Sequence, residues 1–291
     1  MAFSNLALFL TCVAIWGSTW IAITFQLGRV DPAVSVSYRF LLAAAILLAY
    51  CRWRGLSLRF DARDHLFLLL QGATMFSVSY ICVYHAEALV VSGLVAVGFS
   101  ASPLLNMVGV RIVLGTPMTT RVFLGGLLGV AGIVLVFRPE LGTLAADARV
   151  LRGAAFTALA VVTSAVGSVV AARNARLGVA FWQGMALAML YGAASSLLLA
   201  VCAGRPLAFD WSFRYAGSLL YLAVFGSIVA FAGYFTLLGR IGAARAGYIG
   251  AIVPLVALAI SSLFEGFAWR AETWLGIGLS IAGNIVMLRR V

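Results

Sequence analysis

The chain is poor in the residues that build catalytic and metal sites. Its 291 residues include 2 histidines, 4 cysteines and 9 acidic residues, and lysine is absent. The cysteines (Cys12, Cys51, Cys82 and Cys202) show neither CxxC nor metal-ligand spacing, so we interpret them as small buried residues. An enzyme needs a nucleophile, a base or metal ligands that converge on one point. The sequence therefore predicts no catalytic residue, no metal site and no cofactor.

Long polar segments are also missing, and apolar runs take their place. Hydrophobic residues make up 64% of the chain and charged residues 10%, whereas soluble domains are about half apolar and about a quarter charged. A helix needs roughly 20 apolar residues to cross a bilayer. We identify ten such spans, at 5–25, 33–51, 65–85, 92–114, 120–138, 151–172, 180–202, 214–237, 246–264 and 272–289. The predicted fold class is an all-α polytopic membrane protein with ten transmembrane helices.

The net charge of +11 comes entirely from arginine. More of these arginines lie on the connections after even-numbered spans than on the opposite side, where most of the acids lie. Basic loops stay in the cytoplasm, so this bias predicts that both termini are cytoplasmic. We interpret the basic excess as a topology signal and an attraction to anionic lipids, and we expect no nucleic-acid partner.

Pro103 and Pro254 each lie at the centre of a hydrophobic span, 151 residues apart. At the same offset, three glycines match three others: Gly115 and Gly266, Gly125 and Gly276, Gly132 and Gly283. These matches predict an internal duplication, with a five-helix repeat at 1–143 and a second at 144–291. Because five is odd, the second repeat would be inverted in the membrane, as in many secondary transporters.

The two prolines predict flexible points in their helices. A proline inside a helix removes the hydrogen bond to the carbonyl four residues earlier, here Phe99 and Gly250. Gly98 would soften the first of these helices further. Matching broken helices indicate a transport site, so we expect Pro103, Pro254, Gly98 and Gly250 to act in gating. The alternative is a kink that neighbouring helices repack.

Polar and aromatic residues inside spans are candidates for lining a solute path. They are Trp16, Thr19 and Trp20 on one face of the first span, Ser77, Tyr80, Tyr84 and His85 on the third, and Phe99, Asn106, Ser164, Tyr234 and Tyr248 elsewhere. Aromatic rings would suit flat or partly apolar organic solutes. Tryptophan and tyrosine also gather at membrane interfaces, which is the alternative for this set.

Arg39 lies about two turns inside the second span. A charge at this depth is costly unless it is paired or hydrated. It would either bind the carboxylate of an amino-acid substrate, extend to the surface near Asp31, or bond the carbonyls of a neighbouring helix. The last two, structural, roles are slightly favoured by sequence alone.

Carboxylates are absent from the middle of the spans, since Glu87 and Glu265 lie at span ends. Proton- and sodium-coupled carriers usually keep an ionisable side chain inside the membrane. The sequence therefore favours facilitated diffusion or exchange, with a proton step at His85 as the alternative.

Small residues at Gly125 and Gly129 in the fifth span, and at Gly276 and Ser280 in the tenth, predict a closely packed pair of scaffold helices.

Several segments together resemble one family. They are A-I-W-G-S-T-W-I-A at 14–22, Y-R-F-L-L-A-A at 38–44, the two mid-span prolines, L-F-E-G-F at 263–267 and L-G-I-G-L-S-I-A-G-N at 275–284. In these segments the chain resembles the EamA-type exporters of the drug/metabolite transporter superfamily, most closely the bacterial exporters of aromatic amino acids. Leu114 departs from the pattern, because it stands where Glu265 stands in the second half.

The resemblance implies a protein of the bacterial inner membrane that exports amino acids and related metabolites by alternating access through an outward-opening central cavity. The expected partners are small-molecule substrates and membrane lipids, with the protein a monomer or a weak homo-oligomer. Two other functions stay open, a multidrug or organic-cation efflux pump and a scaffold that moves no solute.

Overall fold

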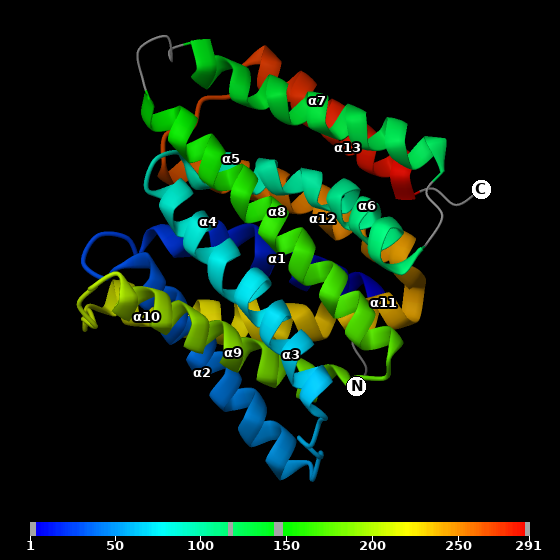
Figure 1. Cartoon of the computed structure of the whole chain (residues 1–291). Coiled ribbons are helices and arrows are strands. Elements are labelled where there is room, and N and C mark those ends of the chain that lie inside the picture. The colour runs from blue at the N-terminus through cyan, green and yellow to red at the C-terminus, as the bar shows by residue number, and fades with distance from the viewer. Residues whose placement is uncertain (1–3, 116–118, 143–147, 289–291) are drawn as a thin grey trace.

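The computed structural model describes residues 4–115, 119–142 and 148–288 (Figure 1). These residues form helices joined by short connections, and none of them lies in a β-strand. The all-α prediction is confirmed. The predicted boundary between 143 and 144 and the charged residues Arg289 and Arg290 lie outside the described residues.

The described residues form ten helical segments. The first five are α1 (Asn5–Thr24), α2 (Pro32–Trp53), α3 (Ala62–Gln71) with η1 (Gly72–Val78) and α4 (Ser79–Glu87), α5 (Ser92–Gly98) with η2 (Phe99–Ala101) and α6 (Ser102–Leu114), and α7 (Thr120–Gly142). The second five are α8 (Ala148–Arg176), α9 (Phe181–Cys202), α10 (Phe213–Tyr221) with η3 (Leu222–Val229) and α11 (Ala230–Ala246), α12 (Tyr248–Phe264), and α13 (Ala271–Leu288). Within the described residues, 8 of these helices are long and apolar enough to cross a membrane, and α12 is a shorter apolar helix.

Polar side chains cap the N-termini of several helices. Ser4 accepts a hydrogen bond from the Ala7 N–H at the start of α1, and Asp31 accepts one from Ala33 at the start of α2. Asp61 does the same for α3. The first turn of a helix has N–H groups without partners in the helix itself. These caps satisfy some of them where the chain enters each span.

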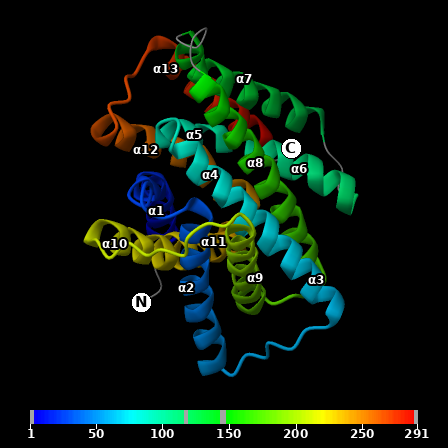
Figure 2. The same cartoon turned by 60° about the vertical axis from the view of Figure 1, so that its left-hand side comes forward.

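The last spans of the two halves cross each other through glycine. A Cβ atom at Gly132 would lie 2.3 Å from the Gly276 carbonyl oxygen, and one at Gly125 would lie 2.6 Å from that of Gly283. Gly125 and Gly132 of α7 therefore each contact the repeat partner of the other glycine, as expected when two equivalent helices cross in opposite directions. Figures 1 and 2 show α7 and α13 side by side, apart from most of the bundle. The predicted scaffold pair is present, and the crossing supports the inverted repeat.

A second relationship between the halves was not visible in the sequence. The third span of each half contains a π-helical segment, η1 in the first and η3 in the second, which begin 150 residues apart at Gly72 and Leu222. In η3 the Ser227 hydroxyl donates to the Leu222 carbonyl five residues earlier. Such wide turns are rare and often occur at functional sites. Here η3 lies against α2 and α1.

The two central prolines do not have the same surroundings. Pro103 lies in the first turn of α6, directly after the 3₁₀ turn η2, so the fourth span is interrupted there. Pro254 lies inside α12, which stays helical on both sides of it. The described backbone is therefore interrupted at only one of the two matched positions.

Candidate functional site

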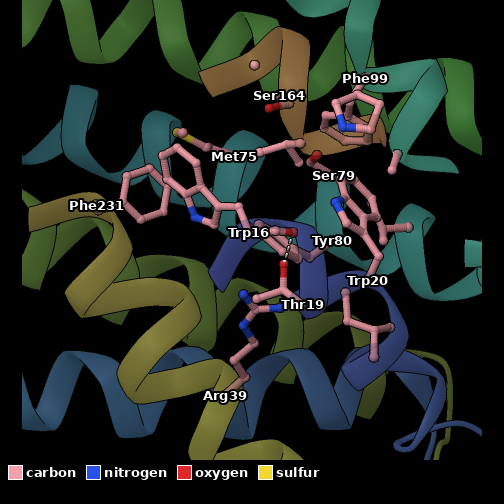
Figure 3. Close-up of a pocket in the computed structure, with 16 residues that line it drawn as sticks. Trp16, Thr19, Trp20, Arg39, Met75, Ser79, Tyr80, Phe99, Ser164 and Phe231 are labelled. Atoms are coloured by element: carbon pink, nitrogen blue, oxygen red, sulfur yellow. Dashed lines mark hydrogen bonds between the residues drawn. The ribbon is translucent and has the colours of Figure 1, made fainter. Parts of the chain in front are cut away.

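A cavity of about 250 Å³ lies at the centre of the bundle (Figure 3). Its walls come from α1, α2, η1, α4, α5, η2, α8, α11 and α12, so both halves contribute. The lining residues are Trp16, Thr19, Trp20, Ile23, Arg39, Met75, Ser79, Tyr80, Val83, Ala96, Phe99, Ser164, Phe231, Gly250, Val253 and Pro254. Most of this surface is apolar.

Aromatic rings form two sides of the cavity. The Trp16 ring contacts Phe231 edge to face, with centroids 5.3 Å apart, and the Trp20 ring lies 5.2 Å from Phe99. The indole N–H of Trp16 donates to the carbonyl oxygen of Gly226 in η3, at 3.3 Å. This hydrogen bond fixes the orientation of the Trp16 ring at the cavity wall.

Arg39 supplies the charge of the cavity. Its side chain is 1% exposed, and its Nε donates to the Ser227 hydroxyl of η3 at 3.2 Å. The guanidinium carbon lies 4.5 Å from the centre of the Tyr80 ring. One terminal nitrogen, NH1, has no hydrogen-bond partner among the described residues. In Figure 3 the guanidinium points from α2 toward Thr19 and Tyr80.

A buried guanidinium with an unused donor is an anion-binding group. Among the described residues that line the cavity, none is acidic. The sequence left a role for Arg39 at the membrane surface, near Asp31, but Asp31 instead pairs with Arg205 at 3.4 Å. Because charges in a low-dielectric interior interact strongly, an incoming anion would be attracted to this point.

The hydroxyl groups of the cavity are partly engaged by their own helices. Thr19 donates to the Trp16 carbonyl at 2.8 Å, and Ser79 of α4 donates to the Ala160 carbonyl of α8. These groups can still accept hydrogen bonds. They place acceptors beside a wall that is otherwise apolar.

The cavity brings together nine of the residues that the sequence singled out: Trp16, Thr19, Trp20, Arg39, Tyr80, Phe99, Ser164, Gly250 and Pro254. Sequence reasoning missed Ile23, Met75, Ser79, Val83, Ala96, Phe231 and Val253. Most of these are apolar and look the same in the sequence as lipid-facing residues. Ser79 could have been found, because it lies among the marked residues of the third span.

Four other candidates lie outside this lining and make contacts between helices. Ser77 accepts a hydrogen bond from Ser196 at 2.8 Å, and Tyr84 donates to Gln26 at 2.6 Å. His85 stacks on Phe156, with ring centres 5.2 Å apart. Tyr234 lies 5.4 Å from the Trp16 ring, behind the cavity wall.

The remaining candidates also lie outside the lining. Asn106 is on α6, and its side-chain oxygen has no partner among the described residues. Tyr248 is the first residue of α12, and Pro103 is in the first turn of α6. A Cβ at Gly98 would lie 2.3 Å from the Thr157 methyl carbon, so this glycine allows α5 to approach α8 closely.

Comparison with known proteins gives one family. The model of the EamA-like transporter family matches the chain twice, over residues 4–138 and 151–289. The chain is 29% identical over 274 residues to the Escherichia coli protein named uncharacterized inner membrane transporter YedA, which covers 94% of this chain and 87% of the relative.

Two further relatives are more distant. Protein PagO of Salmonella typhimurium is 22% identical over 290 residues, 97% of this chain and 91% of the relative. An Archaeoglobus fulgidus protein named uncharacterized transporter is 22% identical over 278 residues, 96% of each chain. A solved structure titled "Crystal structure of protein" superposes with a TM-score of 0.70 at 18% identity, over 97% of this chain and 96% of that one. That likeness concerns the fold.

Proposed function

The chain belongs to the EamA-like transporter family, and we propose that it exports amino acids, aromatic ones included, and related small metabolites across the bacterial inner membrane by alternating access. The observation that carries this proposal is the buried guanidinium of Arg39 in an aromatic cavity. The relative named as an inner membrane transporter supports the location.

Arg39 would bind the carboxylate of the substrate. It is held by Ser227 and Tyr80, and its NH1 donors have no partner among the described residues. A guanidinium binds a carboxylate through charge-assisted hydrogen bonds, which are about twice as strong as neutral ones. A carboxylate arriving here would remove the cost of leaving those donors unpaired.

The rest of the cavity would accommodate the side chain of the substrate. Trp16, Trp20 and Phe99 offer flat apolar faces, which suit an aromatic ring. The cavity volume of about 250 Å³ is close to the lower end of the roughly 300–1,000 Å³ of ordinary ligand pockets. It therefore favours a small metabolite over a large drug.

Alternating access would come from motion between the two repeats, which we place at 1–143 and 144–291. Both halves contribute to the cavity wall, so a movement of one against the other would change its opening. The flexible points would be the interrupted helix at η2 and Pro103 and the proline-containing helix α12. We further propose that both termini are cytoplasmic and that the protein works as a monomer or weak homo-oligomer among membrane lipids.

An organic-cation efflux pump is the competing function. It has weaker support, because the lining carries a buried arginine and the described lining residues include no carboxylate. A cation in this cavity would face the like charge of Arg39, and no described lining residue carries a negative charge to offset it.

The test is efflux from proteoliposomes loaded with radiolabelled phenylalanine, threonine or methylviologen. We expect saturable efflux of the amino acids and a loss of at least tenfold in Arg39→Gln. The matched control is Arg54→Gln, since Arg54 is exposed at the end of α2. Efflux of methylviologen alone would favour the cation pump, and absence of all three fluxes would favour the scaffold.

A further inference from the structure

A second polar site lies where the end of α4, the start of α5 and the end of α12 meet. A cavity of about 440 Å³ is lined there by Glu87, Leu89, Val90, Val91, Leu94, Arg149, Val150 and Glu265. It shares none of its residues with the central cavity. The carboxyl groups of Glu87 and Glu265, residues 178 positions apart in the chain, line the same cavity.

The two carboxyl groups are bonded very differently. Glu265 accepts hydrogen bonds from the backbone N–H of Ser92, at 3.1 and 3.2 Å to its two oxygens, and from the hydroxyls of Ser92 and Ser261. Donors aimed at a carboxylate stabilise its ionised form. The Glu265 carboxyl is therefore held by donors from the start of α5 and the end of α12.

Glu87 has no such donors. Its side chain is 6% exposed, and both carboxyl oxygens are buried without a hydrogen-bond partner among the described residues. Burying an unpaired carboxylate is so costly that the group usually takes up a proton instead. The neighbouring negative charge of Glu265 adds to this cost.

We propose that Glu87 is a proton-binding site, occupied by a proton in this conformation and emptied when this end of the bundle opens. The charged groups around it are Glu265 directly after α12, Arg149 at the start of α8 and Arg39 of α2. The Arg149 guanidinium donates to the Ala88 carbonyl at 3.2 Å. Of these three charged residues, Glu265 and Arg149 line the same cavity as Glu87.

The position of the site links the proton to movement of the helices. Helices α5 and α12 touch beside Glu265: the Gly93 N–H donates to the Ser261 hydroxyl at 2.9 Å, and a Cβ at Gly93 would lie 2.9 Å from a Leu258 methyl carbon. Further along, the same two helices form walls of the central cavity through Ala96 and Pro254. This contact therefore closes the space between α5 and α12 at one end of the central cavity.

Parting of α5 and α12 would admit water to Glu87. Hydration removes the cost of its charge, so the proton would leave, and closing again would require a proton to return. This step rests on the proposed function, because it assumes that the central cavity is a transport path. The protonation of Glu87 itself does not depend on what is transported.

The first experiment is infrared spectroscopy of the purified protein as the pH is raised. We expect a protonated-carboxyl band at neutral pH that is lost in Glu87→Gln and retained in Glu265→Gln. Gln has the shape and neutrality of a protonated Glu, and Glu87→Asp, which should keep a shifted band, guards against misfolding of that variant. A neutral-pH spectrum without the band, or a band unchanged in Glu87→Gln, would overturn the proposal.

The second experiment is exchange of phenylalanine across proteoliposomes at a series of pH values. The wild-type rate should fall on the alkaline side by up to about tenfold per pH unit, as for the loss of one proton. The Glu87→Gln rate should stay constant over that range. Equal pH profiles would overturn the role of Glu87 in opening. Absence of exchange in both proteins would contradict the proposed substrate. The infrared spectra would then be the test of whether Glu87 binds a proton.

Discussion

The guanidinium of Arg39 in α2 stacks against the ring of Tyr80 in α4 at the wall of the central cavity, with its carbon 4.5 Å from the ring centre. The sequence identifies both residues as unusual for a membrane span, but it does not predict that they contact each other. The ring holds the charge on one side, while Ser227 holds it on the other. Together they orient a group that would otherwise be free to rotate.

Tyr80→Leu should weaken binding of an amino-acid substrate. A desolvated cation–π contact contributes about 2 kcal/mol, so the apparent KM for phenylalanine efflux should rise about tenfold or more, with a smaller change in the maximal rate. Tyr80→Phe retains the ring and is the matched control. Equal KM values in the two variants would show that the ring does not position Arg39.

Gly132→Ala should destabilise the protein without acting on the cavity. The added carbon would lie 2.3 Å from the Gly276 carbonyl oxygen and 2.6 Å from the Ser280 nitrogen. Both are backbone atoms, so α7 and α13 would have to move apart, and overpacking of this kind costs about 1–3 kcal/mol. Thermal unfolding in detergent measures the effect.

Gly129→Ala is the control for this crossing. It lies on the same helix one turn earlier, and a Cβ there would have no neighbour within 4 Å. Its melting temperature should match or exceed that of the wild type. If both variants melt alike, the glycine crossing is not what holds α7 to α13.

Much of the fold could be predicted from the sequence, because the bilayer constrains the length of the helices and how they pack. The apolar spans, the central prolines and the small residues of α7 and α13 all follow from helix length and close approach. The π-helical segments could not be predicted from the sequence. They depend on how Gly72 fits against α9 and Gly226 against Thr19 and Arg39, and these contacts form only when the bundle assembles.

The candidate site was predicted in part for a similar reason. Trp16, Tyr80 and Arg39 stand out because polar and aromatic groups are expensive inside a membrane. Tyr84 stands out equally, yet its hydroxyl is used by Gln26 from α1. Glu87 lies at the end of a span, as predicted from the sequence, but in the fold residues of α5, α8 and the segment after α12 surround it. Burial of this kind depends on tertiary contacts alone.

Pro254→Ala should slow transport and leave the fold intact. Proline has no N–H to give to the carbonyl four residues earlier, which belongs to Gly250, an exposed residue at the cavity. Alanine would supply that hydrogen bond, worth about 1 kcal/mol, and make α12 stiffer where it borders the central cavity. The maximal rate of phenylalanine efflux should fall severalfold, while the melting temperature stays the same or rises.

Pro103→Ala is the matched comparison for Pro254→Ala, because the two prolines lie at equivalent positions of the two repeats. Pro103 lies in the first turn of α6, after the 3₁₀ turn η2, where a helix has no intrahelical partner for an N–H group. Alanine there adds little to the helix, so the efflux rate should change less than in Pro254→Ala. A larger loss in Pro103→Ala would place the hinge at the junction of α5 and α6, and unchanged rates in both variants would exclude the prolines from gating.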